Sequence, residues 1–124
     1  MATISPFRGI RYDLARVGDL SRVVAPPYDV IPPDLHRRLA ERHPRNIVNV
    51  DFNPPRDDDQ PGRDRYARAA KHLRTWLDER TLVPDPRPAL YLYEQEFTLD
   101  AQGAPPPTPV VRRGFLAAVR LSTF

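Results

Sequence analysis

The sequence contains no cysteine, and this absence excludes several classes of protein and site at once. A chain without thiols forms no disulfide, has no cysteine nucleophile and holds no metal through cysteine. The composition fits a reducing compartment, so we expect a cytoplasmic protein. No apolar run approaches the about 20 residues that a membrane-spanning helix needs, and we therefore expect a soluble protein with no membrane partner.

Glycine and histidine are also scarce, which argues against a glycine-rich nucleotide-binding loop and against a histidine metal site. The five glycines lie far apart, so neither a dinucleotide-binding fingerprint nor a phosphate-binding loop is present. His36 and His43 fall on one expected helix, but a zinc site needs further ligands. No serine, histidine and acid are arranged as a catalytic triad. We predict no metal site, and the sequence leaves the cofactor unknown.

Lysine is almost missing, since Lys71 is the only lysine among 19 lysines and arginines. The net charge is +3, but the arginines are scattered and mixed with acids, which favours a compositional bias over a basic patch. Nucleic-acid binding is therefore not supported. The three aspartates at 57–59 lack the glycine and the terminal glutamate of an EF-hand loop, so we favour a solvated loop over a cation site.

Proline, in contrast, is abundant, and two double prolines enclose an aromatic residue and an acid. Pro26-Pro27 and Pro32-Pro33 each fix their own φ and push the preceding residue towards an extended conformation. We predict that this rigid loop positions Tyr28 and Asp29 in a site. The alternative is a plain turn, in which Tyr28 is half buried and Asp29 bonds nearby backbone donors. Both interpretations stay open at this point.

Hydrophobic periodicity predicts an α+β fold over residues 1–124, either as a single domain or as an N-terminal fragment of a longer one. We predict two main helices, at 33–43 and 63–80, and Trp76 is expected to anchor the core. Extended segments or strands are predicted at 3–12, 22–25, 46–52, 89–99 and 110–121. Within the first of these, Gly9 either marks a bulge or lets a ligand approach the backbone beside Arg8, and we favour the bulge.

The last two strands are expected to form an antiparallel pair in a mixed or antiparallel sheet. Glu94 and Glu96 would then face Arg112 or Arg113, in exposed ion pairs worth less than about 1 kcal/mol each. The connection at 100–109 is too rich in proline for a sheet interior. An unpaired strand edge would also allow the chain to associate with itself.

Short motifs spread over nearly the whole chain carry a family resemblance: Pro6-Phe7-Arg8-Gly9, Ala25-Pro26-Pro27-Tyr28-Asp29-Val30-Ile31, Leu90-Tyr91-x-Tyr93-Glu94-Gln95-x-Phe97 and Arg113-Gly114-Phe115. With these motifs the chain resembles the N-terminal part of domain of unknown function family 1015. This uncharacterised prokaryotic family is often described as similar to the ParB partition proteins. Because its members are longer, the resemblance implies a truncated fragment of a larger ParB-like or sulfiredoxin-like protein.

The resemblance also implies a function for the complete relatives, namely binding of a nucleotide or phosphorylated metabolite, with phosphoryl transfer. Arg8 would contact an anionic group through its planar fork, Asp29 would orient a hydroxyl or act as a catalytic base, and Tyr28 would form the pocket wall. A downstream Asp-Gly-His-His-Arg box of the family is not found in this sequence. The alternatives are a ParB-like DNA-binding partition module and an inactive fragment.

Overall fold

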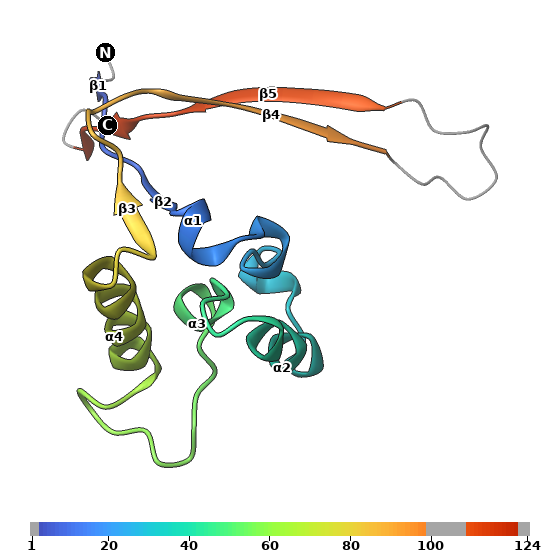
Figure 1. Cartoon of the computed structure of the whole chain (residues 1–124), viewed down its shortest axis with the longest axis vertical. Helices are drawn as coiled ribbons and strands as arrows, with labels where there is room; N and C mark the ends of the chain where they lie inside the picture. Colours follow the sequence, from blue (N-terminus) through green and yellow to red (C-terminus); the bar gives the residue numbers. More distant parts are fainter. Residues whose placement is uncertain (1–2, 99–108, 122–124) are drawn as a thin grey trace. The chain divides into compact units, whose positions relative to one another are not determined.

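The computed structural model describes residues 3–98 and 109–121 of the chain (Figure 1). The fold is α+β, with small antiparallel sheets and four α-helices in the described part. Contacts divide the chain into two compact units: a central unit, Ile10–Pro84, and a terminal unit made of Met1–Gly9 and Asp85–Phe124. No helix among the described residues is both long enough and apolar enough to cross a membrane.

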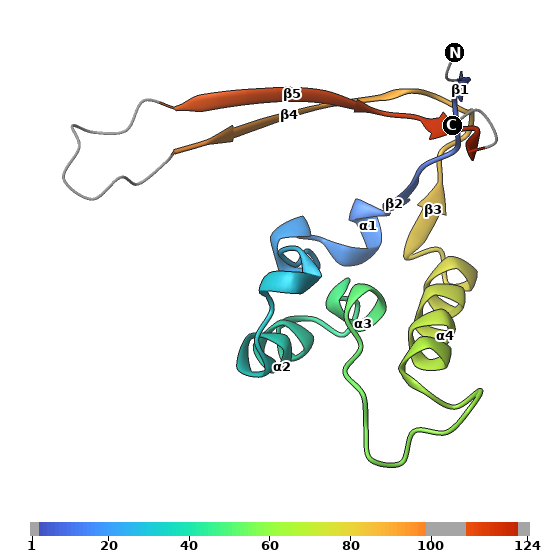
Figure 2. The ribbon, with the colours of Figure 1, turned by 180° about the vertical axis from the view of Figure 1, so that it is seen from behind.

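The central unit is mainly helical and is closed by one short antiparallel pair of strands. Its elements are β2 (Ile10–Tyr12), α1 (Leu14–Val17), the 3-10 turns η1 (Leu20–Arg22) and η2 (Tyr28–Val30), α2 (Pro33–Arg42), α3 (Val48–Asp51), α4 (Arg65–Asp78) and β3 (Leu82–Pro84). Strands β2 and β3 pair antiparallel, with Tyr12 opposite Leu82. The short helix α3 lies between α2 and α4 (Figure 2), so both longer helices pack against it.

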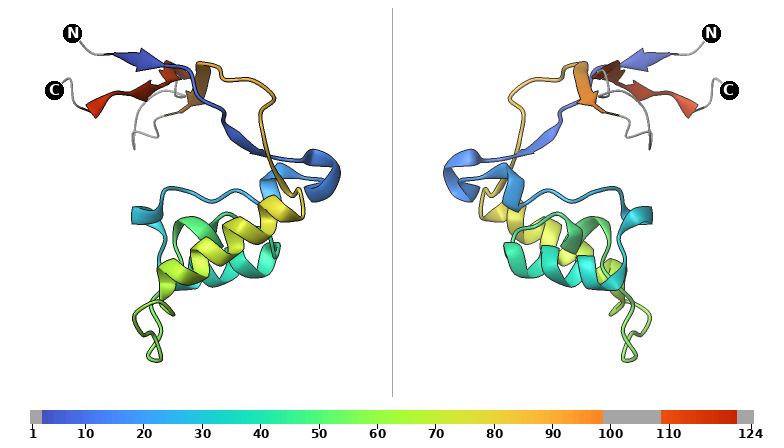
Figure 3. Two further views of the ribbon diagram at one scale, coloured as in Figure 1. Left: turned by 90° about the vertical axis from the view of Figure 1, so that its left-hand side faces the viewer. Right: turned by 90° about the vertical axis from the view of Figure 1, so that its right-hand side faces the viewer.

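The two main helices begin and end close to their predicted limits. Helix α2 starts with Pro33 at its first position, without a side-chain cap from Pro32, and it ends before His43 and Pro44. Helix α4 is capped by the Asp64 carboxylate, which accepts hydrogen bonds from the next turn's backbone N–H groups. The loop predicted around the aspartates at 57–59 spans residues 53–62, and Figure 3 shows it extending past the N-terminal end of α4.

The core of the central unit is small, and Trp76 is its largest fully buried side chain, as predicted. A second group of buried residues, Ile31, Leu39 and Val48, packs between α2 and α3. Asn46 is also fully buried, and its amide donates hydrogen bonds to the carbonyls of Arg22 and Val24. This amide therefore ties the segment before α3 to the segment after η1.

The predicted strand at 46–52 is wrong, because these residues form the helix α3. The Asn46 side chain accepts a hydrogen bond from the N–H of Val48 at 3.0 Å, which starts a helical turn. Val48 and Phe52 lie four residues apart, so a helix places both on the face that packs against the core. The same alternation of apolar residues thus fits a strand period and a helical one.

The predicted strand at 22–25 is also wrong. Asp19 accepts hydrogen bonds from the backbone N–H and the hydroxyl of Ser21, which stabilises the 3-10 turn η1. Val23 follows this turn in a helical conformation and is completely buried. Val23 therefore contributes to the core, whereas Val24 is exposed, and neither residue belongs to a sheet.

The terminal unit contains two antiparallel pairs, β1 (Ile4–Ser5) with β6 (Ala118–Val119) and β4 (Tyr91–Phe97) with β5 (Val110–Leu116). The predicted antiparallel pairing is confirmed, and Glu94 faces Arg113 with an ion pair of 2.6 Å. Glu96 faces Val111 instead of an arginine. The predicted connection at 100–109 lies almost entirely outside the described residues. Among these residues β4 and β5 pair only with each other, and self-association through their edges stays a prediction.

Gly9 leaves room for the ring of Tyr91. A Cβ atom at position 9 would lie 2.8 Å from the ring, and the Gly9 N–H donates a 2.6 Å hydrogen bond to the Tyr91 hydroxyl. That hydroxyl in turn donates to the carboxylate of Asp85, also at 2.6 Å. The absence of a side chain at this position therefore permits a hydrogen-bonded junction between the two halves of the terminal unit.

We expect the Gly9→Ala substitution to displace the Tyr91 ring and to destabilise the terminal unit by about 1–3 kcal/mol, as other overpacked sites do. Hydrogen exchange at the amides of Phe7 and Ala89 measures this effect, because these amides form the neighbouring bridge. The Tyr91→Phe variant is the control that keeps the ring and removes its hydroxyl. Unchanged exchange in Gly9→Ala would show that the close approach is not needed.

Candidate functional site

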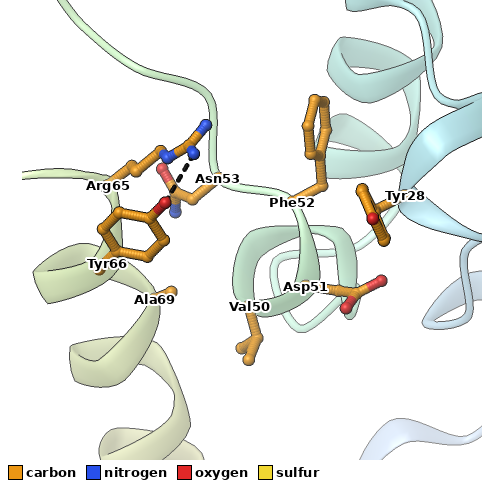
Figure 4. Close-up of a pocket in the computed structure, with 8 residues that line it drawn as sticks. All are labelled: Tyr28, Val50, Asp51, Phe52, Asn53, Arg65, Tyr66 and Ala69. Carbon is orange, nitrogen blue, oxygen red and sulfur yellow. Dashed lines mark hydrogen bonds between the residues drawn. The ribbon is translucent and has the colours of Figure 1, made fainter.

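The central unit contains an open pocket of about 360 Å³ between η2, the C-terminal end of α3 and the first turns of α4 (Figure 4). Its wall combines aromatic, apolar and charged side chains: Tyr28, Val50, Asp51, Phe52, Asn53, Arg65, Tyr66 and Ala69. All of these residues belong to the central unit. This pocket is the strongest candidate for a binding site in the described part of the chain.

Helix α3 and the residue after it form the first wall of the pocket. The helix ends where Phe52 donates its N–H to the Val48 carbonyl, and the Asn53 amide then donates to the Asn49 carbonyl at 2.9 Å. These two bonds fix the backbone direction as the chain leaves the helix. Asp51, Phe52 and Asn53 all line the pocket, with Asn53 beside Arg65 and Tyr66 and the other two near Tyr28 (Figure 4).

The opposite wall carries a paired arginine and tyrosine at the start of α4. The Arg65 guanidinium carbon lies 4.8 Å from the centre of the Tyr66 ring, and one of its N–H groups donates to the Tyr66 hydroxyl at 2.7 Å. An arginine has five N–H donors, so this single bond orients the guanidinium while leaving further donors for an anion. The pair therefore forms a preoriented cationic group beside the pocket.

Asp51 and Tyr28 lie together across the pocket from Arg65 and Tyr66 (Figure 4). Asp51 is exposed, and its carboxylate has no hydrogen-bond or ion-pair partner among residues 3–98 and 109–121. An ionised carboxylate accepts hydrogen bonds from hydroxyl or ammonium groups. The pocket thus has a cationic end and an anionic end, with the apolar side chains of Val50 and Ala69 also in its lining.

The structure places the three predicted site residues in different surroundings. Tyr28 lines the pocket, and its predicted role as the wall of a binding site stays a prediction. Asp29 follows it in η2 and is exposed, but it is not part of the pocket lining. Arg8 belongs to the terminal unit, where its Nε donates to the Asp85 carbonyl at 2.6 Å. A shared cleft for Asp29 and Arg8 therefore stays a prediction.

Asp51, Arg65 and Tyr66 were not predicted from the sequence. Asp51 was assigned to a strand, so its position at the end of a short helix could not be anticipated. A helix was predicted at 63–80, and Arg65 and Tyr66 lie in the first turn of the observed helix. No local signal, however, indicates that this turn meets α3.

The acidic run at 57–59 contributes an ion pair to the structure. Asp59 pairs with Arg68, and the hydrogen bond from this guanidinium lowers the pKa of the Asp59 carboxyl. The described part of the chain contains no group of three or more histidine, aspartate or glutamate side chains that could hold a metal ion. The Asp59 carboxylate is therefore already paired with Arg68 of α4.

Two partly buried histidines of the central unit have a lowered pKa. Burial lowers the pKa of His36, whose Nε2 has no hydrogen-bond partner among the described residues. Burial, followed by the nearby charge of Arg45, also lowers the pKa of His72. The His36 ring packs edge-on against Phe52, a residue of the pocket lining, with 6.1 Å between the ring centres. Protonation of either histidine is therefore more difficult in the folded state.

We expect the free energy of unfolding to fall as the pH decreases below 6.5, the ordinary pKa of histidine. The unfolded chain takes up protons there that the folded chain resists, so acid favours unfolding. The aspartates with lowered pKa, Asp19 and Asp59, act in a separate window below 3.8. Urea unfolding at several pH values between about 7.5 and about 5, a range that brackets the ordinary pKa of histidine, measures how steeply the free energy of unfolding changes with pH. A His36→Gln, His72→Gln double variant with the same slope would contradict this explanation.

Comparison with known proteins gives a family for this chain. The model of a family described as a protein of unknown function (DUF1015) matches residues 4–124. No curated protein and no solved structure matches the chain. The match covers nearly all of the sequence and confirms the resemblance carried by its motifs. The chain therefore belongs to the DUF1015 family of proteins of unknown function.

Proposed function

We propose that the chain binds a nucleotide or a phosphorylated metabolite in the pocket of the central unit. The observation that carries this proposal is the Arg65–Tyr66 pair, in which stacking and one 2.7 Å hydrogen bond orient a guanidinium at the pocket wall. A planar guanidinium with free donors is well suited to a phosphate group, because it forms two parallel charge-assisted hydrogen bonds. The phosphate of the ligand would bind at this end.

The other end of the pocket suits the sugar and base of a nucleotide. The exposed ring of Tyr28 offers a face for stacking, and the exposed carboxylate of Asp51, which pairs with no other described residue, offers acceptors for ribose hydroxyls. A volume of about 360 Å³ is near the lower limit of typical ligand pockets, which range from about 300 to 1,000 Å³. The pocket therefore suits one small ligand, such as a nucleoside monophosphate.

The proposal includes roles for the two residues outside the pocket lining. Asp29 would orient a hydroxyl group or act as a base, and Arg8 would contact an anionic group through its planar fork. In longer relatives these groups would take part in phosphoryl transfer on a ParB-like or sulfiredoxin-like fold. Unchanged ligand binding in the Arg8→Ala and Asp29→Asn variants would remove both residues from the site.

Isothermal titration of the whole chain with AMP, ribose 5-phosphate and phosphoserine tests the proposal. We expect saturable binding of at least one of these phosphate esters and no binding of adenosine at the same concentrations, because adenosine lacks the anionic group. A chain that binds none of the three esters would overturn the proposal. Comparison among the three ligands separates a nucleotide from a smaller phosphorylated metabolite.

The DNA-binding alternative requires a continuous basic face. Several arginines of the described residues are instead paired with acids, namely Arg38 with Asp34, Arg45 with Glu79, Arg68 with Asp59 and Arg113 with Glu94. Such pairing reduces the positive charge that is free to bind phosphates. Binding of duplex DNA with a steep dependence on salt concentration would nevertheless favour this alternative over the pocket.

A further inference from the structure

Arg68 connects helix α4 to the loop that follows α3, on the side of the pocket. Its Nε donates to the side-chain oxygen of Asn53 at 3.1 Å, and one terminal nitrogen donates to the Pro54 carbonyl at 2.8 Å. Both terminal nitrogens also donate to the carboxylate of Asp59. One side chain of α4 therefore holds three separate groups of the loop, and only 20% of that side chain is exposed.

The contacts of Arg68 continue into α3 through Asn53. The Asn53 amide accepts from Arg68 with its oxygen and donates with its nitrogen to the Asn49 carbonyl of α3. Asn53 also lines the pocket, next to Phe52 and Asp51. Arg65 lies three residues before Arg68, so the two side chains leave α4 about one helical turn apart. The chain of hydrogen bonds consequently links the wall that carries Asp51 to the wall that carries Arg65.

We propose that Arg68 is a positioning residue that sets the separation of these two walls, with Asp59 as its counter-charge. This inference rests on the proposed function, because a ligand must contact Arg65 and Asp51 together for the separation to matter. A small misplacement of groups that bind one ligand jointly reduces its affinity strongly. Arg68 would therefore control binding without touching the ligand.

The geometry requires arginine at this position. A guanidinium has donors in fixed directions and reaches Asn53, Pro54 and Asp59 at once, whereas the single nitrogen of lysine does not. The Arg68→Lys variant keeps the charge and much of the side-chain length. It therefore separates the effect of the hydrogen-bond geometry from the effect of the charge.

Titration with two ligands of different length tests the proposal. In the proposed binding mode AMP contacts both walls, with its phosphate at Arg65 and its ribose at Asp51, whereas inorganic phosphate contacts only the Arg65 wall. We expect Arg68→Lys to weaken AMP binding by about 10-fold, similar to the loss of other supporting hydrogen bonds around a site, and to leave phosphate binding within about 2-fold. The Asp59→Asn variant removes the counter-charge of Arg68 and is expected to act like Arg68→Lys. Asp57→Asn makes the same charge change in the same loop and is its matched control. An equal loss of affinity for both ligands, or no loss for either ligand, would overturn the proposal.

A second measurement keeps this inference separate from the proposed function. If the unaltered chain binds no AMP, the proposed function fails, and the positioning role is then judged from nuclear magnetic resonance spectra without ligand. We expect Arg68→Lys and Asp59→Asn to shift the side-chain amide signals of Asn53 and the backbone signals of Asp51 and Tyr66, while Asp57→Asn leaves them in place. If Arg68→Lys does not fold, Asp59→Asn decides alone. Unshifted signals would overturn the role of Arg68.

Discussion

The Arg65→Gln variant is expected to bind AMP about 10- to 100-fold more weakly than the unaltered chain, because hydrogen bonds to a charged group contribute about 1.5–3 kcal/mol each. Glutamine keeps a polar side chain of moderate length but loses the positive charge and the planar fork. It also loses the stacking that holds the guanidinium 4.8 Å from the Tyr66 ring centre. Isothermal titration at fixed salt concentration measures the change in affinity.

Arg74→Gln is the matched control for this variant, since Arg74 is an exposed arginine of the same helix. Nine residues separate it from Arg65, which places it on the opposite face of α4. The control removes an identical charge without changing the pocket. If both variants lose the same affinity, the effect comes from overall charge and the pocket is not the binding site.

The Trp76→Ala variant is expected to lower the stability of the central unit by about 3–5 kcal/mol, the usual cost of removing a buried tryptophan. Trp76 is completely buried, with the rings of Tyr12 and His72 beside it at 6.4 and 5.8 Å between centres. Removal of the indole ring would leave a cavity between β2 and α4. Because Trp76 is the only tryptophan, urea unfolding is best followed by circular dichroism.

Trp76→Phe is the control for this experiment. The indole Nε1 has no hydrogen-bond partner among the described residues, so phenylalanine loses volume but no hydrogen bond. We expect a smaller loss of stability than in the alanine variant. A Trp76→Ala protein as stable as the unaltered chain would contradict the placement of Trp76 in the core.

Local signals in the sequence predicted the elements that local interactions stabilise. Pro33 marks the beginning of α2, and Pro44 marks where it must have ended. The pairing of β4 with β5 was predicted from two long segments of strand-forming residues. Arg113 was one of the two arginines expected opposite Glu94, whereas Glu96 faces Val111. In these elements the propensities of the residues and the final structure agree.

The helix α3 could not be predicted, because distant residues decide its structure. Alternation at Val48, Val50 and Phe52 suits a strand, yet the backbone N–H of Ile47 bonds the Val23 carbonyl at 2.7 Å and fixes the chain at the start of a helical turn. The buried Asn46 strengthens the same junction. Tertiary contacts thus override a local pattern that was compatible with both periods.

Rigidity visible in the sequence pointed to one residue of the pocket lining. The double prolines predicted that Tyr28 is held in place in a site; Tyr28 lines the pocket, and its role in binding stays a prediction. Asp51 and Arg65 are separated by 13 intervening residues, including the loop at 53–62. The packing of α3 against α4 brings the two helices together, and this packing is not visible in the local sequence. The link that Arg68 makes to Asn53 and Asp59 is equally nonlocal.

Titration of the isotope-labelled chain with AMP, followed by nuclear magnetic resonance, tests the central claim most directly. Binding in the pocket predicts progressive shifts concentrated at Tyr28, Asp51, Tyr66 and Ala69, together with the side-chain Nε signal of Arg65. Shifts confined to other parts of the chain, or no shifts at saturating AMP, would contradict the claim that this pocket recognises a phosphorylated ligand.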